Sequence, residues 1–418
     1  MRRKLALAGG SVAFGLVVLE LVLRWLVPPM LPGVATAHTP NARFASWALP
    51  PRTWLTLADP DTGRLIPFRT NARGWKDRDH SLAKPPGVFR IVVLGDSYTY
   101  GLVAVDQQYT TRLEAMLRQN GWPQCEVVSI GVSGWGTDQA LEALISEGVQ
   151  YRPDLVIYQF CSNDLLENLY PEPGMPLPTP FHRVKHFRYR RQPDGSLEKV
   201  SLEVHPPRMS TWKRMRNALR SLALVSLVER AARAGEGRAA GAILDGASVS
   251  QSAEVHPDSP YFLYAAGEEP PGTRRAWDLL DALVRRMAEV ARSHGAEFVV
   301  FSESGDPGRR RWFLEHGLIR CGPEGDCLIA GRATRPIDLQ RPLKNLARLC
   351  DDAQIPIIRP TRAYTRYHHD SHTNPEGNER MAADLADFLT QHTRLARTSQ
   401  ADEGRSGGRP SPPARLVR

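Results

Sequence analysis

The stretch FRIVVLGDS, residues 89–97, places a serine directly after a short, mostly apolar run. A run of this length and character predicts a buried strand, and the glycine that follows it favours a sharp turn. Open α/β sheets carry their chemistry at the carboxyl ends of their strands. We therefore expect Ser97 to present its hydroxyl group at such an end.

Two further predicted strands end in polar or glycine-rich segments. The run CEVVSI (125–130) is followed by GVSGWG, and the run LVIYQF (155–160) is followed by CSND. An oxyanion hole needs N–H donors that converge where negative charge develops. We expect three donors here: the Ser97 amide, the Gly134 amide and the side chain of Asn163.

A base and its orienting acid are predicted far downstream, in the segment HHDSHTN (368–374). We expect His372 to be the base and Asp370 to orient it, which completes a nucleophile–base–acid set with Ser97. His369 is the rival base, but in an extended loop its side chain points away from its neighbour Asp370. A metal cluster of these histidines and Asp370 is a further interpretation, although no H-E-x-x-H or paired C-x-x-C motif supports it. We expect no metal and no cofactor.

With these blocks in order, the sequence resembles the SGNH, or GDSL-like, hydrolase family over residues 70–165 and 275–390. The motifs that match are Gly95-Asp96-Ser97, Ser133-Gly134, Asn163-Asp164 and Asp370-Ser371-His372 with Asn374 and Gly377. The resemblance implies Ser97 as nucleophile, with no cofactor. There are two departures: Cys161 stands where the family usually has glycine, and the acid lies two residues before the histidine where three is commoner.

Strands and helices alternate along the chain. Besides the strands above, we predict strands over 297–302 and 356–358, and helices over 106–119, 138–148, 275–293, 342–352 and 376–390. Such alternation favours a parallel sheet covered on both faces. The resemblance implies the flavodoxin-like three-layer α/β/α sandwich. The alternation breaks in a predicted insertion over about 165–273, which holds a hairpin near 185–204 and an amphipathic helix at 211–234.

The N-terminus predicts the compartment. Basic residues at 2–4 precede 5–23, an apolar stretch whose only ionisable residue is Glu20. This approaches the ~20 residues that cross a bilayer, and the preceding basic residues favour a cytoplasmic N-terminus. We expect a signal anchor over 1–27, one transmembrane helix that places the catalytic domain on the periplasmic side of the inner membrane. The alternative is a signal peptide cleaved after Ala35-Thr36-Ala37.

The remaining boundaries follow composition. A Pro-rich connection is expected over 28–70, the hydrolase domain over 71–393 and a disordered basic tail over 394–418. The tail carries part of the net charge of +9. A second basic segment, KHFRYRR at 185–191, is compatible with nucleic-acid binding, but a following Pro-Asp-Gly turn favours an exposed strand, so we expect no nucleic acid.

The chain has five cysteines: Cys125, Cys161, Cys321, Cys327 and Cys350. Outside the cytoplasm some could pair. Cys321 and Cys327 bracket a turn-rich loop that could close a small disulfide, and Cys350 is the competing partner. Sequence alone leaves the connectivity open.

The function expected from the residues is acyl-ester chemistry through a covalent serine intermediate. The resemblance to envelope-anchored relatives, which include carbohydrate O-acetylesterases and O-acetyltransferases, implies acetylated cell-surface polysaccharide as the substrate. No other long apolar run is present, so a multi-span acyl-donor transporter would be a separate, polytopic partner. The alternatives are a lipase-like esterase for longer acyl chains and a catalytically weak, membrane-tethered scaffold or carbohydrate-binding partner.

Overall fold

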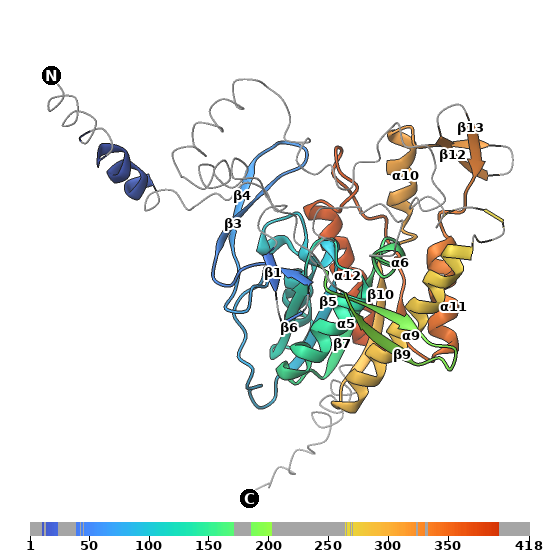
Figure 1. Cartoon of the computed structure of the whole chain (residues 1–418), viewed down its shortest axis with the longest axis horizontal. Helices are drawn as coiled ribbons and strands as arrows, with labels where there is room; N and C mark the ends of the chain where they lie inside the picture. Colours follow the sequence, from blue (N-terminus) through green and yellow to red (C-terminus); the bar gives the residue numbers. More distant parts are fainter. Residues whose placement is uncertain are drawn as a thin grey trace, which may run out of the picture.

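A five-stranded parallel sheet forms the centre of the computed structural model (Figure 1). The structure describes residues 11, 14–23, 39–41, 43–44, 46–170, 185–202, 264, 266–267, 269, 271–322, 325–330 and 333–392. The sheet strands are β5 (Phe89–Gly95), β6 (Cys125–Gly131), β7 (Leu155–Phe160), β10 (Glu297–Ser302) and β14 (Ile357–Ile358).

The strand order across the sheet is β14-β10-β7-β5-β6. Counted along the chain, this is the flavodoxin-like order 2-1-3-4-5. The structure therefore confirms the predicted α/β fold with a parallel sheet, and each predicted sheet strand is present.

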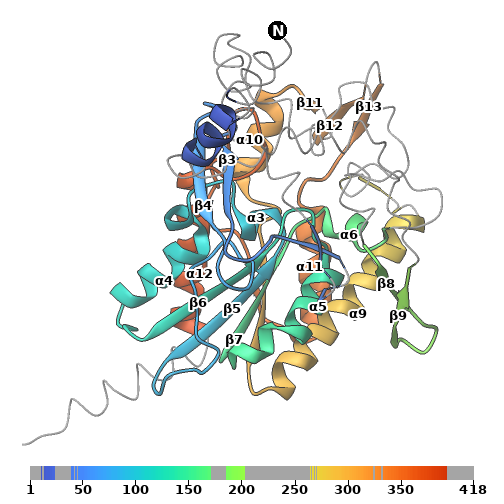
Figure 2. The same ribbon diagram turned by 60° about the vertical axis from the view of Figure 1, so that its left-hand side comes forward.

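Helices cover both faces of the sheet (Figure 2). On one face lie α4 (Tyr109–Gln119) and α12 (Pro375–His392), and on the other lie α5 (Thr137–Ser146), α9 (Pro271–Ser293) and α11 (Arg341–Asp352). Strand β5 shows why: Ile91 and Val93 pack toward the first pair, whereas Val92 and Leu94 pack toward the second set. A strand that is apolar on both sides can be buried only between two helical layers.

The carboxyl ends of β5 and β7 form the switch point of the sheet, because the chain moves to opposite sides of β5 when it adds β6 and β7. Helix α3 (Ser97–Tyr100) follows β5, and α6 (Asp164–Glu167) follows β7. Ser97 and Asn163 therefore begin neighbouring segments at the position where ligands bind in folds of this kind.

Two paired glycines allow α3 to lie close against the strand ends. Gly95 and Gly131 face each other in the β5–β6 register. A Cβ atom on Gly95 would lie 2.3 Å from the Thr99 Oγ1, and one on Gly131 would lie 2.7 Å from the Tyr100 amide nitrogen. Neither position has room for a side chain, so these glycines set where the serine-bearing helix begins.

The segment expected to be a Pro-rich connection contains two antiparallel hairpins that the sequence analysis did not predict. They are β1 (Thr39–Asn41) with β2 (Ser46–Ala48), and β3 (Trp54–Ala58) with β4 (Leu65–Arg69). The second hairpin packs its apolar face on Leu102, Val103 and Tyr367. It thus contacts both the segment after α3 and the loop that leads to the predicted base.

A second unpredicted unit lies between β10 and α11. It consists of α10 (Pro307–Glu315) and an antiparallel sheet of β11 (Ile319–Gly322), β12 (Gly325–Ala330) and β13 (Ala333–Pro336). Phe313, Ile319 and Ile337 pack together with Tyr264 in a small apolar cluster. Figure 2 shows this unit at the same end of the sheet as α3.

The predicted hairpin of the insertion is present as β8 (Phe187–Arg191) and β9 (Leu197–Ser201). It is held to α5 by Glu142, which accepts from the Tyr189 hydroxyl at 2.5 Å and pairs with Lys199. Part of the basic segment therefore has a structural role. The predicted helix at 211–234 and the tail at 394–418 lie outside the described residues.

Residues 14–23 form helix, and Phe14, Val17 and Leu21 on it are exposed. Among the described residues, no helix combines the length and apolar character needed to cross a bilayer. The predicted transmembrane helix is thus not confirmed.

The candidate disulfides are absent: all five cysteines are free. Cys321 and Cys327 lie on the paired strands β11 and β12, but Cys327 faces Arg320 in the register and so is offset from Cys321. Cys350 is buried on α11 and unpaired.

Candidate active site

Three of the predicted site residues meet at the carboxyl end of the sheet. The Ser97 Oγ lies 2.8 Å from the His372 Nε2, although the two residues are 275 positions apart in the chain. On the other side of the imidazole, the Asp370 Oδ1 lies 2.5 Å from Nδ1. A carboxylate can only accept, so Nδ1 carries the proton and Nε2 is free to accept from the serine hydroxyl.

The position of Ser97 is set by the start of α3. Asp96 caps this four-residue helix, because its Oδ1 accepts from the Tyr98 amide at 3.0 Å. The cap ties the turn that leaves β5, and Ser97 becomes the first helical residue. Its side chain is largely buried, with 8% of the residue exposed.

The charges around the imidazole favour a base that can take up a proton. Burial lowers the pKa of His372, but the Asp370 carboxylate attracts the imidazolium and accepts its N–H, and the net pKa is raised. Burial likewise raises the pKa of Asp370, and the same contacts with His372 reverse this, so that its pKa falls below the ordinary value. The pair therefore stabilises the imidazolium that forms when the serine loses its proton.

Asn163 is brought next to the nucleophile through Asp96. Its Nδ2 donates to the Asp96 Oδ2 at 3.3 Å. Burial raises the pKa of Asp96 to about 6, and the hydrogen bond from the Tyr98 amide opposes this rise. The amide group of Asn163 is thus held at the rim of the site by the residue that precedes the serine.

Gly134 lies on the turn after β6, one strand away from Ser97. Its φ of +77° falls in the left-handed region, which glycine adopts without strain. The part assigned to its amide in an oxyanion hole stays a prediction.

His369, the rival base, and His368, which belongs to the metal interpretation, contact a different part of the structure. The amides of His368 and His369 donate to the two carboxylate oxygens of Asp61, at 2.9 and 2.8 Å. The contact with Ser97 is made by His372. Across the described ranges, no group of three or more His, Cys, Asp or Glu residues is arranged to hold a metal ion.

Several residues that hold the 366–374 loop were not found from the sequence. Asp61 is one, and Trp312 on α10 is another, since its Nε1 donates to the Tyr367 carbonyl at 2.8 Å. On the same helix, His316 Nε2 contacts the His368 carbonyl. Side chains that bind a distant backbone group leave no motif or periodic pattern, so the sequence carries no signal for them.

Cys161, at the position where the resemblance expects glycine, is buried beside the site. Its thiol donates to the Glu303 Oε1 at 2.9 Å. Glu303 is fully buried and pairs with Arg309 and Arg366. The side chain at 161 therefore contacts a charged network that lies behind the triad.

A parallel sheet in flavodoxin-like order, with a serine, a histidine and an aspartate meeting at its switch point, defines the SGNH class of α/β hydrolases. The model of the GDSL-like Lipase/Acylhydrolase family matches residues 93–325, more than half of the 418 residues. The chain belongs to this family, and it is a hydrolase of the esterase or lipase type. The resemblance inferred from the four motifs is confirmed.

Solved structures with similarity to this chain include TesA, with 12% identity over 72% of this chain and 97% of that chain and a TM-score of 0.34. The acetyl xylan esterase AlAXEase has 11% identity over 72% and 100%, with a TM-score of 0.35. A GDSL-like lipase from Bacteroides thetaiotaomicron VPI-5482 has 13% identity over 74% and 92%, with a TM-score of 0.32. A search among curated proteins gave no match.

Proposed function

We propose that this chain is a serine-dependent acyl-ester hydrolase or acyltransferase of the cell envelope, which acts on O-acetyl groups of polysaccharide. The observation that carries the chemistry is the 2.8 Å contact between the Ser97 Oγ and the His372 Nε2, with Asp370 behind the imidazole. This geometry is that of a nucleophile within reach of its base.

In the first half-reaction, His372 Nε2 takes the hydroxyl proton as the Ser97 Oγ bonds to the ester carbonyl carbon. The carbonyl electron pair moves onto the oxygen, where the Ser97 amide, the Gly134 amide and the Asn163 Nδ2 are proposed to stabilise it. When the tetrahedral intermediate collapses, the bond to the alcohol oxygen breaks. His372 returns its proton to that oxygen, and the acyl group stays on Ser97.

In the second half-reaction, His372 takes a proton from the acceptor, whose oxygen attacks the acyl carbon. The Ser97–acyl bond breaks, and the serine regains its proton from the imidazolium. Water as acceptor gives hydrolysis, and a sugar hydroxyl gives transfer. Both outcomes use the same residues, so the acceptor alone separates the two activities.

The nucleophile is tested with a fluorophosphonate label on the full-length chain. We expect the label on Ser97, and we expect Ser97→Ala to lose both labelling and ester hydrolysis. Ser371→Ala is the matched control, because it removes a hydroxyl group on the residue next to the base without changing a triad side chain. Label on another residue, or activity that survives in Ser97→Ala, would refute the mechanism.

The substrate proposal rests on the resemblance to envelope-anchored carbohydrate O-acetylesterases and O-acetyltransferases. Aryl acetate, butyrate and octanoate esters compare acyl chain lengths, and acetylated oligosaccharides test the alcohol. We expect the acetate to be preferred and acetylated oligosaccharides to be deacetylated. A preference for octanoate would favour the lipase-like alternative. Trapping the acyl-enzyme and offering water and oligosaccharide in competition then distinguishes hydrolase from transferase.

The envelope location is supported by the basic residues at 2–4, the apolar stretch at 5–23 and the exposed apolar side chains within 14–23. We expect the full chain to remain with the membrane fraction after an alkaline carbonate wash, and a form that lacks residues 1–38 to be released. If the alkaline wash releases the full chain from the membrane fraction, the proposed membrane anchor is contradicted. The scaffold alternative is tested in cells. If the protein is a scaffold, the Ser97→Ala variant should keep the cellular role of the parent, whereas an enzyme should lose it.

A further inference from the structure

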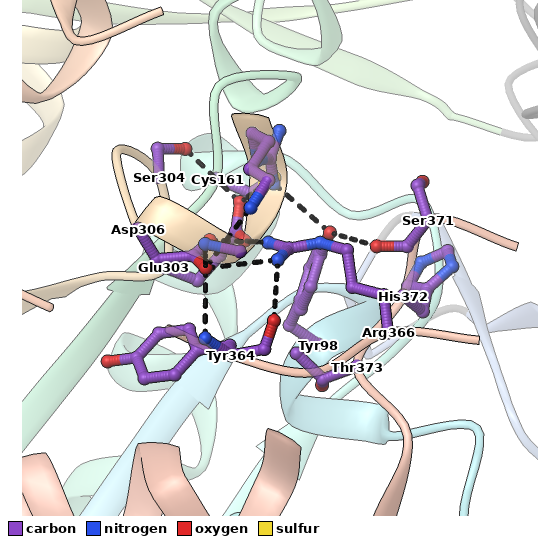
Figure 3. Close-up of polar contacts among 12 residues, drawn as sticks. Tyr98, Cys161, Glu303, Ser304, Asp306, Tyr364, Arg366, Ser371, His372 and Thr373 are labelled. Atoms are coloured by element: carbon purple, nitrogen blue, oxygen red, sulfur yellow. Dashed lines mark hydrogen bonds and ion pairs between the residues drawn. The ribbon is translucent and has the colours of Figure 1, made fainter. Parts of the chain in front are cut away.

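A buried polar network lies next to Tyr98, to one side of the catalytic histidine, and the mechanism above does not use it (Figure 3). Its acids are Glu303, which follows β10, and Asp306, which caps α10. Its positively charged residues are Arg309 on α10 and Arg366 on the loop before the triad acid. Glu303 and Asp306 are at most 1% exposed, and the Arg366 side chain is 2% exposed.

The charges in this network are balanced and paired. Arg309 pairs with Glu303. Arg366 lies 2.6 Å from the Asp306 Oδ2 and 3.4 Å from the Glu303 Oε2. Burial raises the pKa of Glu303, but the two arginines outweigh it and hold that pKa below its ordinary value. Charges persist at this depth only when they are paired and hydrogen-bonded.

Tyr98 connects the network to the triad. Its hydroxyl accepts from the Arg309 Nη2 at 3.1 Å and faces the Ser371 carbonyl oxygen at 3.2 Å. Arginine has only donors, so the single phenol proton is directed to the Ser371 carbonyl. Burial raises the pKa of Tyr98 well above its ordinary value, which keeps the hydroxyl a donor.

The position of Tyr98 gives this hydrogen bond a consequence for catalysis. Tyr98 is the neighbour of Ser97 on α3, and Ser371 is the residue between Asp370 and His372. The Tyr98 ring also lies against the His372 ring, with centroids 5.0 Å apart. Figure 3 shows the ring beside the imidazole and the hydroxyl pointing to the Ser371 carbonyl. One side chain therefore links the nucleophile helix to the loop that carries the base.

We infer that Tyr98 is a positioning residue, whose hydroxyl group, oriented by Arg309, fixes the Ser371 carbonyl and thereby the imidazole of His372 against the Ser97 Oγ. This inference rests on the proposed function of the same site. The proposed mechanism gives neither Tyr98 nor Arg309 a contact with the ester, so we assign their effect to the alignment of the base during proton transfer.

The matched control for Tyr98 is Tyr100 on the same short helix. Tyr100 is 1% exposed, and within the described part of the chain its hydroxyl has no hydrogen-bond partner. A change to phenylalanine keeps the ring at both positions. Only at Tyr98 does it remove a hydrogen bond to the catalytic loop, so the pair separates alignment from packing.

The experiment uses the full-length chain and an aryl acetate. For Tyr98→Phe we expect kcat to fall about tenfold, the effect of losing one oriented hydrogen bond, with KM unchanged. We expect the rate of fluorophosphonate labelling of Ser97 to fall by the same factor, because that reaction needs the same base but not the substrate's alcohol. Both rates should be unchanged in Tyr100→Phe.

A second variant tests whether Arg309 acts through the hydroxyl. Arg309→Lys keeps the charge beside Glu303 but loses the planar fork that reaches Tyr98 at the same time. We expect a several-fold fall in kcat in the parent background and no further fall in the Tyr98→Phe background. If Tyr98→Phe fails to fold, the kcat and KM of Arg309→Lys alone decide the question.

Three results would overturn the inference: a kcat within twofold of the parent in Tyr98→Phe, an equal loss in Tyr100→Phe, or a rise in KM at unchanged kcat. In each case Ser97→Ala would still be inactive and unlabelled. Activity in Ser97→Ala would instead refute the proposed function itself, so the two failures are distinguishable.

Discussion

Ser97 and His372 meet at 2.8 Å, but the two sides of this contact are built differently. The serine lies where β5 passes into α3, and the two glycines at the strand ends have no room for a side chain, so α3 packs closely against them. The histidine sits in the loop over residues 359–374, whose only strand-like pairing is the single bridge between Arg366 and Thr373.

Side chains from distant parts of the chain hold this loop. Asp61 binds it from the β3–β4 turn, Tyr98 from α3, and Trp312 from α10. Each such hydrogen bond contributes only about 1 kcal/mol. The nucleophile side therefore depends on backbone packing, and changes there should cost stability. Apart from the buried ion pair of Arg366 with Asp306, the base side depends on separate, small contacts, and changes in those contacts should reduce the rate before they reduce stability.

The largest effect is expected on the base side, in Asp370→Asn. We expect kcat to fall about 10⁴-fold, as in comparable triads, because the imidazole loses its tautomer and orientation. The carboxylate also contributes to the raised pKa of His372. A neutral base is needed for activity, so removal of the carboxylate should shift the acid limb of the kcat/KM profile to lower pH. A pH series measures both effects, and a limb that shifts upward would contradict the assignment.

Asn163→Ala tests the side chain on the nucleophile side that, besides Ser97, is expected to act in the reaction. We expect a loss of about 10²–10³ in kcat, typical for one oxyanion donor. The protein should remain folded, since within the described residues the side-chain amide makes a single hydrogen bond, 3.3 Å long, to Asp96. The melting temperature and the kcat are measured together. Full activity would exclude Asn163 from the mechanism.

Gly131→Ala tests the backbone on the nucleophile side. A Cβ atom there would lie 2.7 Å from both the Thr99 side chain and the Tyr100 amide nitrogen. We expect unfolding free energy to fall by about 1–3 kcal/mol, the usual cost of overpacking. Gly272→Ala is the control, because nothing lies within 4 Å of its added Cβ. Equal stability of the two variants in a denaturant titration would contradict the view that the nucleophile side depends on backbone packing.

The smallest effect is expected in Asp61→Asn. An amide oxygen in place of one carboxylate oxygen loses a charge-assisted bond to the His368 or His369 amide. We expect kcat to fall about threefold, consistent with a small hydrogen-bond loss, while the melting temperature stays within about one degree because Asp61 is exposed. Asp194→Asn, in the turn between β8 and β9, is the control. A drop in stability without a drop in kcat would show that Asp61 supports the fold and does not align the base.

The sequence predicted the parts of the molecule that local patterns specify. Strand β5 is apolar on both faces, and helix α12 has a clear period, so both were predicted close to their observed bounds. Ser97, Asp370 and His372 were predicted because they stand in short motifs, and the structure brings them together. Their catalytic roles and that of Gly134 stay predictions.

The parts that were missed depend on contacts between distant segments. Strands β1 and β2 have three residues each, too few to show an alternating pattern. Helix α10 carries a run of arginines that obscures the apolar pattern in its sequence, and one of them, Arg309, is buried where it pairs with Glu303. The state of the cysteines, which the sequence left open, is likewise decided by register: Cys321 and Cys327 are offset on β11 and β12, and all five cysteines are free.

The β3–β4 hairpin also decides where the chain can be shortened. A recombinant form that starts at residue 93, where the family match begins, would lack Asp61. It would also lack Lys76, whose buried ammonium group binds the carbonyls of Tyr100 and Gly101 at 3.3 and 2.7 Å. A shortened form for crystallisation should therefore start ahead of Thr39, so that it omits the apolar stretch at 5–23 and keeps Asp61, Lys76 and both hairpins.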